Sequence, residues 1–244
     1  MSHVSASTTA VHIRDHRSVL AAAEKRLLIA IARRLPPFVN SDHLSVLGFA
    51  SIMLTGVCFA LMSVTPAAAY GIPVALALNW FGDSLDGTVA RVRNHQRPRY
   101  GYYVDHVIDI AGTTALMAGL AASALMSPTL AFALLSAYLL LCAESYLSTH
   151  ASGVFKMSFL GFGPTELRIV LIAGALKAAI SPFVDVPGLG SMRLFDVGAV
   201  VALVGMSSAF LISAAKTTRA LYAAEPLPTS SAYVSTDGRE EQVA

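Results

Sequence analysis

The stretch GDSLDGTVARVRNHQRPRYGYYVDHVID, residues 82–109, carries four aspartates and joins two long apolar segments. If these segments are helices, Asp83 and Asp86 share a face at a spacing of three residues, and Asp105 and Asp109 at a spacing of four. An ionised carboxylate at the centre of a membrane helix costs about 2.5–3.5 kcal/mol. Converging carboxylates also repel one another. One or two hard divalent cations held by their oxygens would offset both penalties, so the sequence predicts a metal site.

The residues after the second aspartate predict an anionic ligand beside the metal. Gly87 costs a helix about 1 kcal/mol relative to alanine, which is understandable where a ligand must approach the backbone closely. Ala90 is also small, and Arg91 places a permanent positive charge one turn beyond the acids. Carboxylates for a metal, space for a ligand and a guanidinium group together indicate a diphosphate site.

Eight residues of this stretch form a motif with fixed spacing: Asp83-x-x-Asp86-Gly87-x-x-Ala90-Arg91 and Gly101-x-x-x-Asp105-x-x-x-Asp109. The motif closely resembles the signature of the CDP-alcohol phosphotransferases, also called CDP-alcohol phosphatidyltransferases. The spacer 92–100 is one residue longer than is usual in that family. The resemblance implies six transmembrane helices, Mg²⁺ or Mn²⁺ as cofactor, and transfer of a substituted phosphate from a CDP-alcohol to a hydroxyl, with release of CMP.

The resemblance also implies roles for single residues. Asp83, Asp86, Asp105 and Asp109 would bind metal, with two ions expected, and Asp109 would also be the general base that takes the proton of the acceptor hydroxyl. Seven residues would bind the CDP-linked donor: Gly87, Ala90, Arg91, Gly101, Asp42, Ser45 and Arg97.

Five further polar residues are candidates for binding the alcohol acceptor: Glu144, His150, Lys156, Glu166 and Arg168. For Glu144 and His150 the alternative is pairing with neighbouring helices, and Arg168 would equally mark the cytoplasmic side. The segment 161–166 is similar to one in choline and ethanolamine phosphotransferases. Glu166 would also suit the positive N-terminal end of a helix.

The composition predicts an integral membrane protein. Of the 244 residues, 55% are hydrophobic and 13% charged, and the mean hydropathy is +0.62. Globular domains contain about 25% charged residues. A net charge of +2, with no basic patch interleaved with aromatic residues, gives no reason to expect nucleic acid as a partner. Cys58 and Cys142 lie in apolar segments, so we expect buried thiols and no disulfide.

Apolar runs near 20 residues predict six transmembrane helices, at about residues 43–63, 70–92, 102–126, 129–150, 165–184 and 194–216. The expected fold is therefore an all-α membrane protein with one domain over residues 38–224. Residues 1–11 and 225–244 are expected to be disordered.

Residues 12–37 are expected to form an amphipathic juxtamembrane helix. Leu27, Leu28 and Ile31 lie near one face, and lysine and arginine side chains surround the other. This pattern is typical of a helix at the interface of an anionic membrane. A solvated helix packed on the body of the protein is the alternative.

Basic residues concentrate in the N-terminal arm, in the connection 91–99 and after residue 215. The positive-inside rule then places both termini on the cytoplasmic side of the cell membrane. The aspartates would lie near the cytoplasmic ends of their helices, where soluble CDP-linked nucleotides are found. Gly112 and Gly119 are typical of close helix packing or of a homodimer face.

The preferred function is phospholipid synthesis with CDP-diacylglycerol as donor and an alcohol as acceptor, in contact with membrane lipid. One alternative is a CDP-choline or CDP-ethanolamine phosphotransferase with a lipid acceptor. Another is a divalent-cation transporter, which explains the aspartates but not Gly87, Ala90 and Arg91 at their fixed spacings. A purely structural membrane scaffold is the third.

Overall fold

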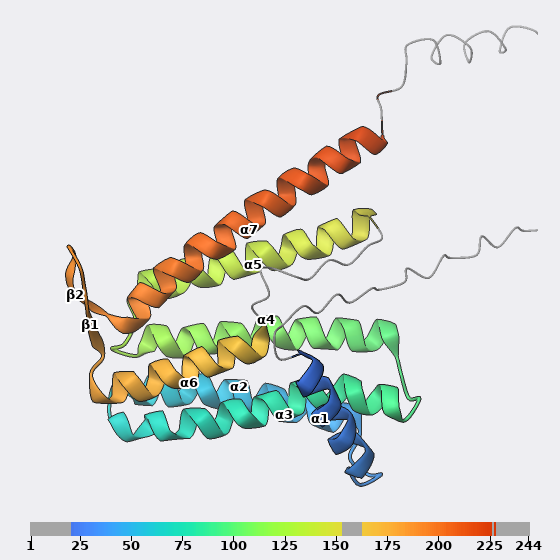
Figure 1. Cartoon of the computed structure of the whole chain (residues 1–244), viewed down its shortest axis with the longest axis horizontal. Helices are drawn as coiled ribbons and strands as arrows, with labels where there is room; N and C mark the ends of the chain where they lie inside the picture. The colour runs from blue at the N-terminus through green and yellow to red at the C-terminus, as the bar shows by residue number, and fades with distance from the viewer. Residues whose placement is uncertain (1–20, 153–162, 226, 228–244) are drawn as a thin grey trace, which may run out of the picture.

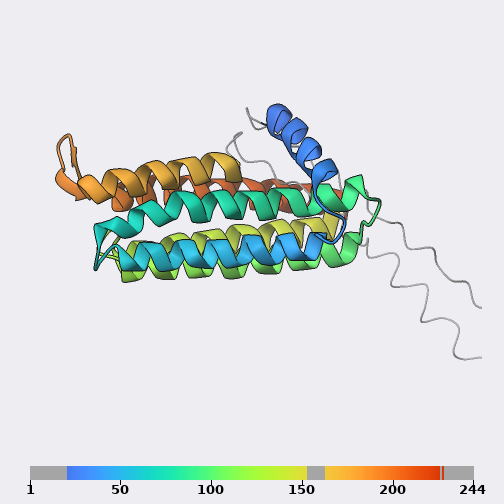
Figure 2. The same ribbon diagram turned by 90° about the horizontal axis from the view of Figure 1, so that it is seen from below.

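A computed structural model describes residues 21–152, 163–225 and 227 of the chain. In chain order, the elements are α1 (Ala21–Arg34), α2 (Ser41–Leu61), the 3₁₀ turn η1 (Pro66–Tyr70), α3 (Gly71–Val92), α4 (Pro98–Ala122), α5 (Pro128–Ser152), α6 (Pro164–Ile180), β1 (Phe183–Val186), β2 (Gly190–Arg193) and α7 (Leu194–Ala224). Helices α2 to α7 run broadly along one axis, whereas α1 crosses one end of them steeply (Figures 1 and 2).

The six predicted transmembrane segments correspond to α2 through α7, although several ends differ. Helix α4 begins at Pro98, four residues before the predicted start, because proline is tolerated in the first turn, where its missing N–H has no helical partner. Helix α7 continues to Ala224, beyond the predicted end at residue 216. Sequence therefore predicted the helices better than their boundaries.

Among the described residues, four helices are long and apolar enough to cross a membrane: α2, α4, α5 and α7. Helix α3 carries Asn79, Asp83 and Asp86, which lower its hydropathy, and α6 has only 17 residues. Length and composition therefore indicate a membrane protein without confirming all six predicted spans.

The strands β1 and β2 form an antiparallel hairpin between α6 and α7, an addition to the expected all-α architecture. The sequence analysis did not predict these strands. Gly188 in the turn and Gly190 at the start of β2 both have a φ of 80°, a conformation that glycine adopts without steric cost. The hairpin lies at the end of the bundle opposite to α1 (Figures 1 and 2).

Glycines bring α2 into backbone contact with α3 and α4. A Cβ added at Gly82 of α3 would lie 2.5 Å from the backbone nitrogen of Gly48, and one added at Gly119 of α4 would lie 2.1 Å from the carbonyl oxygen of Gly56. Gly112 also packs on α2. The small residues of α4 therefore serve packing within the chain, and a homodimer stays a prediction.

The main apolar core lies toward the hairpin end of the bundle. It includes Phe59 near the end of α2, Ile72 at the start of α3, Leu120 near the end of α4 and Phe195 at the start of α7. The rings of Phe59 and Phe195 meet edge to face, with centroids 5.4 Å apart. Burial is therefore concentrated away from the aspartates.

Helix α1 packs on the body of the protein through its apolar face. Leu28 and Ala32 are buried in a second cluster with Leu44 of α2 and with Leu85 and Val89 of α3. This contact agrees with the packed alternative, and the position of the basic face on a membrane surface stays a prediction.

Several predictions fall outside the described residues. These are the disorder expected for residues 1–11, residues 12–20 of the juxtamembrane helix, and the disorder expected for 225–244 apart from Glu225 and Leu227.

Candidate functional site

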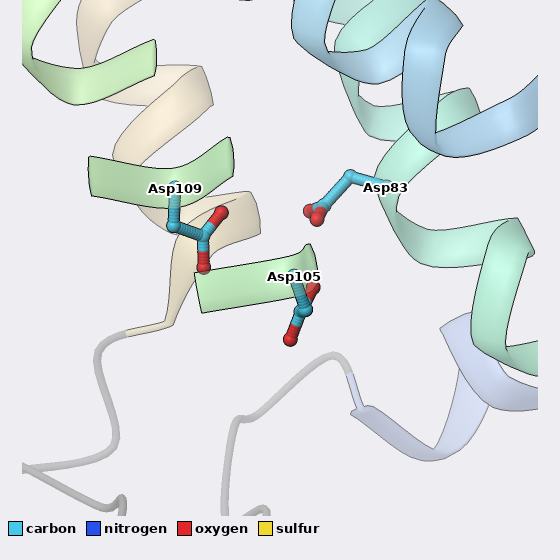
Figure 3. A group of neighbouring side chains, drawn as sticks. All are labelled: Asp83, Asp105 and Asp109. Atoms are coloured by element: carbon cyan, nitrogen blue, oxygen red, sulfur yellow. The ribbon is translucent and has the colours of Figure 1, made fainter. Parts of the chain in front are cut away.

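Three of the four predicted aspartates meet between α3 and α4. One carboxylate oxygen from each of Asp83, Asp105 and Asp109 lies within 4.8 Å of the other two. Figure 3 shows Asp83 pointing toward the two carboxylates from α4. Asp83 and Asp105 are half-buried, whereas Asp109 is exposed, so the group can be reached from outside the protein. We call these three residues the carboxylate cluster.

The carboxylate cluster lies well inside the ends of α3 and α4. Asp83 precedes the end of α3 at Val92 by nine residues, and Asp105 follows the start of α4 at Pro98 by seven. At 1.5 Å per residue these offsets place the carboxylates about 10–14 Å inside the helix ends. The aspartates therefore lie on the two expected helices, and their role as a metal site stays a prediction.

Helix α2 fixes the rotation of α3 at this level. The side-chain amide of Asn79 donates a hydrogen bond from Nδ2 to the carbonyl oxygen of Gly48 at 2.9 Å. Three residues later in α3, Gly82 packs against the backbone of the same turn of α2. Together, these contacts turn Asp83 toward α4.

Asp86 is held by the first turn of α2. Its Oδ2 accepts a hydrogen bond from Oγ of Ser45 at 2.7 Å, and its Oδ1 accepts one from the backbone N–H of Gly87. Ser41 also donates to the backbone carbonyl of Asp86 at 3.0 Å. Asp86 is thus placed beside the carboxylate cluster without being one of its three members, and its role as a metal ligand stays a prediction.

Arg168 of α6 reaches the carboxylate cluster. Its Nη2 lies 2.5 Å from Oδ2 of Asp83, and its Nε donates to Oδ1 of Asn79 at 2.8 Å. The sequence analysis proposed Arg168 for an anionic acceptor or as a marker of the cytoplasmic side. It missed the pairing with Asp83, which lies 85 residues earlier in the chain.

The donor set of the carboxylate cluster fits a hard divalent cation. Carboxylate oxygens are the ligands that Mg²⁺ and Mn²⁺ prefer. Three ionised carboxylates carry three negative charges, and the guanidinium of Arg168 offsets one, which leaves two. One divalent ion would therefore bring this group to neutrality.

A cavity of about 580 Å³ opens beside the carboxylate-bearing helices. Its lining comes from the α1–α2 linker, from the start of α2, from the end of α3 and from the α3–α4 connection, and it includes the predicted donor-binding residues Asp42, Ala90 and Arg97. Ligand pockets typically measure about 300–1,000 Å³, so the cavity can take a small molecule.

Two residues that line the cavity, Asp42 and Arg97, form an ion pair. Nη2 of Arg97 contacts both carboxylate oxygens of Asp42, at 2.5 and 2.6 Å. The hydrogen bond from Arg97 to Asp42 raises the pKa of the guanidinium further above its usual value. Arg97 also lies 4.0 Å over the ring of Tyr100. Both side chains of the pair are substantially exposed, so they contribute little to stability and are available to a ligand.

Gly87, Arg91 and Gly101 do not line this cavity, but two of them lie together. A Cβ added at Gly87 would meet Nη1 of Arg91 at 3.2 Å, so the guanidinium lies over the glycine. Arg91 also donates from Nη2 to Oγ1 of Thr88 at 3.0 Å. Gly101 is exposed in the first turn of α4, and among the described residues no atom lies within 4 Å of a Cβ added there.

Arg93 is a site residue that the sequence analysis missed. Its guanidinium donates to four backbone carbonyls of the α1–α2 linker: Leu35 at 2.9 Å, Pro36 at 3.1 Å, Pro37 at 3.4 Å and Val39 at 2.6 Å. Arg93 also lines the cavity. It therefore fixes the linker that leads into Ser41 and Asp42, and only its place next to the motif could have suggested this.

The candidate acceptor residues do not form one group. Glu144 accepts a hydrogen bond from Thr217 of α7 at 3.5 Å, in agreement with the alternative of pairing with a neighbouring helix. Glu166 accepts from the backbone N–H of Gly163 at 3.0 Å and so caps α6. Lys156 lies outside the described residues.

His150 lines a second, largely apolar cavity of about 420 Å³ between α4 and α5. The cavity also contains His106, whose Nδ1 lies 2.8 Å from the carbonyl oxygen of Tyr102. His106 is buried between the rings of Tyr102 and Tyr146, as expected for a structural histidine.

Comparison with protein families identifies a match over most of the chain. Residues 40–211 match the family model for CDP-alcohol phosphatidyltransferase, which corresponds to well over half of the chain. The match begins at Asn40, the N-cap of α2, and includes the whole aspartate motif. No significant match is found among the curated proteins.

Proposed function

This chain belongs to the CDP-alcohol phosphatidyltransferase family, and we propose that it transfers a phosphatidyl group from CDP-diacylglycerol to an alcohol acceptor in phospholipid synthesis. The family transfers such groups from CDP-alcohols. The observation that carries the proposal is the meeting of Asp83, Asp105 and Asp109 between α3 and α4. A cavity at the end of α3, lined by the donor-binding candidates Asp42, Ala90 and Arg97, supports it.

The carboxylate cluster provides the charge that a metal-bound diphosphate requires. Asp83, Asp105 and Asp109, with Asp86 adjacent, would hold Mg²⁺ or Mn²⁺, and bound ions would supply positive charge to the diphosphate of the donor and to the departing CMP. Hydrogen bonds to Asp86 from α2 and the ion pair of Asp83 with Arg168 orient two of these carboxylates before any ligand binds.

The cavity at the end of α3 is the proposed place for the cytidine part of the donor. Asp42 and Arg97 would bind its polar groups, and Ala90 leaves room on the α3 side. Arg91, lying over Gly87, adds a positive charge for the diphosphate. Arg93 holds the wall formed by the linker in place.

Asp109 is the proposed general base. It is the most exposed member of the cluster, so an acceptor hydroxyl can approach it. The hydroxyl proton would pass to the Asp109 carboxylate as the hydroxyl oxygen forms a bond to the phosphorus that carries the diacylglycerol. The bond between that phosphorus and the diphosphate oxygen breaks, and CMP leaves with the electron pair.

Four apolar helices and the family together indicate an integral membrane protein. We further propose that α3 and α6 complete six spans of one domain over residues 38–224, with the carboxylate cluster opening to the cytoplasm. In support, α1 and the end of α7 lie at the same end of the bundle as the α3–α4 connection, which is rich in arginine (Figures 1 and 2).

The experiment supplies purified protein in detergent with CDP-diacylglycerol, CDP-ethanolamine and CDP-choline in parallel, with Mg²⁺ or Mn²⁺ and a panel of alcohols. CMP release and mass spectrometry of new lipids are measured. We expect CMP and a new phospholipid from CDP-diacylglycerol only with metal present, and a large loss in Asp83→Asn. The control Asp185→Asn, in β1 at the other end of the bundle, should keep the wild-type rate.

Other results would replace the proposal. Turnover of CDP-choline or CDP-ethanolamine alone, with diacylglycerol as acceptor, would identify the other branch of the family. Metal-dependent ion flux without any CMP would favour a transporter. Unchanged nucleotide affinity after alanine substitution of all four motif aspartates would favour a scaffold.

A further inference from the structure

Glu24 of α1 connects two other helices through a single carboxylate oxygen. Its Oε1 accepts a hydrogen bond from Nε1 of Trp80 in α3 at 2.6 Å and another from Oγ1 of Thr165 in α6 at 3.0 Å. Helix α1 crosses α3 close to the start of α6, which brings the three segments together (Figures 1 and 2). The two contacts span 56 and 141 residues of sequence.

Both partners of Glu24 lie one helical turn before the members of an ion pair. Trp80 precedes Asp83 by three residues, and Thr165 precedes Arg168 by three. Residues three apart lie on the same face of a helix. The Glu24 bridge and the pair of Asp83 with Arg168 are therefore two successive links between α3 and α6.

The start of α6 is held by polar contacts. Its buried apolar side chains lie later in the helix and do not anchor the first turn. The buried side chains of α6 are Leu171, Ala175 and Ala178. The contacts of its first two turns with other helices include the bond of Thr165 to Glu24 and those of Arg168 to α3. Loss of one such link frees the end of the helix that reaches the carboxylate cluster.

We propose that Glu24 is a positioning residue of the phosphatidyl-transfer site. By holding the first turn of α6 against α3, it keeps Arg168 on Asp83 and so sets how strongly the carboxylate cluster binds a divalent cation. The role in transfer rests on the proposed function, whereas the effect on the cluster itself does not. Glu24 lies in α1, before the family match begins at residue 40.

The expected effect on cation binding has a definite sign. Arg168 occupies an oxygen of Asp83 and places a positive charge beside the cluster. When α6 is released, the oxygen becomes available to a cation and the opposing charge moves away. Glu24→Ala should therefore bind Mn²⁺ more tightly, by about threefold to tenfold, since charges at such distances interact strongly in a partly buried site. A substitution that merely loosened the fold would weaken binding.

The test titrates MnCl₂ alone into purified protein and measures free Mn²⁺ by electron paramagnetic resonance. Glu24→Gln loses the same negative charge but keeps an oxygen that can accept from Trp80 and Thr165, so it should bind Mn²⁺ as the wild type does. Arg168→Gln should bind more tightly, as Glu24→Ala does. The double variant Glu24→Ala/Arg168→Gln should have the same Mn²⁺ affinity as Arg168→Gln alone. Both substitutions remove the ion pair between Arg168 and Asp83, so their effects should not add.

Trp80 provides a second, optical measurement, because it is the only tryptophan in the chain. Its fluorescence should shift in Glu24→Ala, which removes the partner of its indole N–H, and should not shift in Lys25→Ala, an exposed neighbour on α1.

Thr165→Val removes only the hydroxyl at the start of α6. It should give a smaller increase in Mn²⁺ affinity and serves as the deciding variant if Glu24→Ala does not fold.

Turnover completes the test. In Glu24→Ala, kcat should fall about tenfold while KM for CDP-diacylglycerol stays within about twofold, since the donor cavity is lined by the linker, α2, α3 and the α3–α4 connection. Wild-type Mn²⁺ affinity in both Glu24→Ala and Thr165→Val, or additive effects of Glu24→Ala and Arg168→Gln, would overturn the proposal. Absence of CMP release from the wild type would instead count against the proposed function, because the Mn²⁺ and fluorescence measurements need no substrate.

Discussion

The two ends of the helix bundle are held together in different ways. At the hairpin end, α2, α3, α4 and α7 meet through buried apolar side chains such as Phe59 and Phe195. At the other end, a smaller apolar cluster packs α1 on α2 and α3. Polar contacts there link further segments, and residues such as Glu24, Arg93 and Arg168 each bind more than one partner.

The two ends should therefore contribute differently to the protein: the hairpin end mainly to stability, and the end with the carboxylate cluster mainly to the proposed function. Burial of apolar side chains contributes about 1.5–3 kcal/mol for each large residue, and it acts mostly at the hairpin end. The three converging carboxylates oppose folding, because like charges repel. Substitutions at the two ends should therefore change activity and melting temperature in different combinations.

The largest effect is expected from Asp109→Asn. Loss of the proposed general base should lower kcat about 10²–10⁴-fold, as is typical for such groups. CMP should still bind, because the cavity is intact, and the melting temperature without added metal should rise, because one of three like charges is gone. CMP release, calorimetric CMP binding and thermal denaturation measure the three quantities. Near-normal turnover would show that another group is the base.

Gly119→Leu tests the hairpin end and should mainly lower stability. A side chain here must displace the backbone of Gly56, so we expect a loss of about 3 kcal/mol or more, above the usual range for overpacking. The matched control is Gly205→Leu in α7, where no described atom lies within 4 Å of an added Cβ. Thermal denaturation in detergent compares the two. Equal melting temperatures would mean that α2 and α4 are not in backbone contact.

Arg93→Lys should affect donor binding more than chemistry. An ammonium group cannot reach four carbonyls of the linker, and each lost hydrogen bond costs about 0.5–1.5 kcal/mol. We expect KM for CDP-diacylglycerol to rise about tenfold, which corresponds to about 1.4 kcal/mol, with kcat within about threefold. Arg99→Lys, at the start of α4, is the control. A fall in kcat at constant KM would contradict this role.

The smallest effect is expected from Thr217→Val, between α5 and α7. Its hydroxyl contacts Ser148 at 3.3 Å and Glu144 at 3.5 Å, and replacement should change stability by about 0.5 kcal/mol or less. Turnover of Thr217→Val and Glu144→Gln should stay within about twofold of the wild type. A large rise in KM for the alcohol in Glu144→Gln would restore Glu144 as an acceptor-binding residue.

The sequence was sufficient to predict those features that depend on a local pattern of residues. Apolar runs predicted α2 to α7, and helical spacing predicted that Asp105 and Asp109 share a face. A short connection joins α3 and α4, so their aspartates could be expected at the same end of the bundle. In the structure, α2 packs against both helices and holds them together. The family resemblance implied that Asp42 and Arg97 bind the donor. Both line the same cavity, and their role in binding stays a prediction.

The remaining features depend on how distant helices pack, which no local pattern encodes. The pairing of Arg168 with Asp83 requires α6 to lie along α3, and the bond of Glu24 to Thr165 requires α1 to cross near the start of α6. The depth of Asp105 and Asp109 depends on where α4 begins, which is Pro98 and not the predicted residue 102.

The β1–β2 hairpin also offers an attachment point for imaging. A chain of 25.6 kDa gives little signal for aligning particles in electron cryomicroscopy. The turn residue Leu189 is 73% exposed, and the hairpin end lies about 18 Å from Asp83, counted along α3 from Gly71 at 1.5 Å per residue. A rigid fusion partner or an antibody epitope placed in this turn would enlarge the particle and leave the end with the carboxylate cluster open to added ligands.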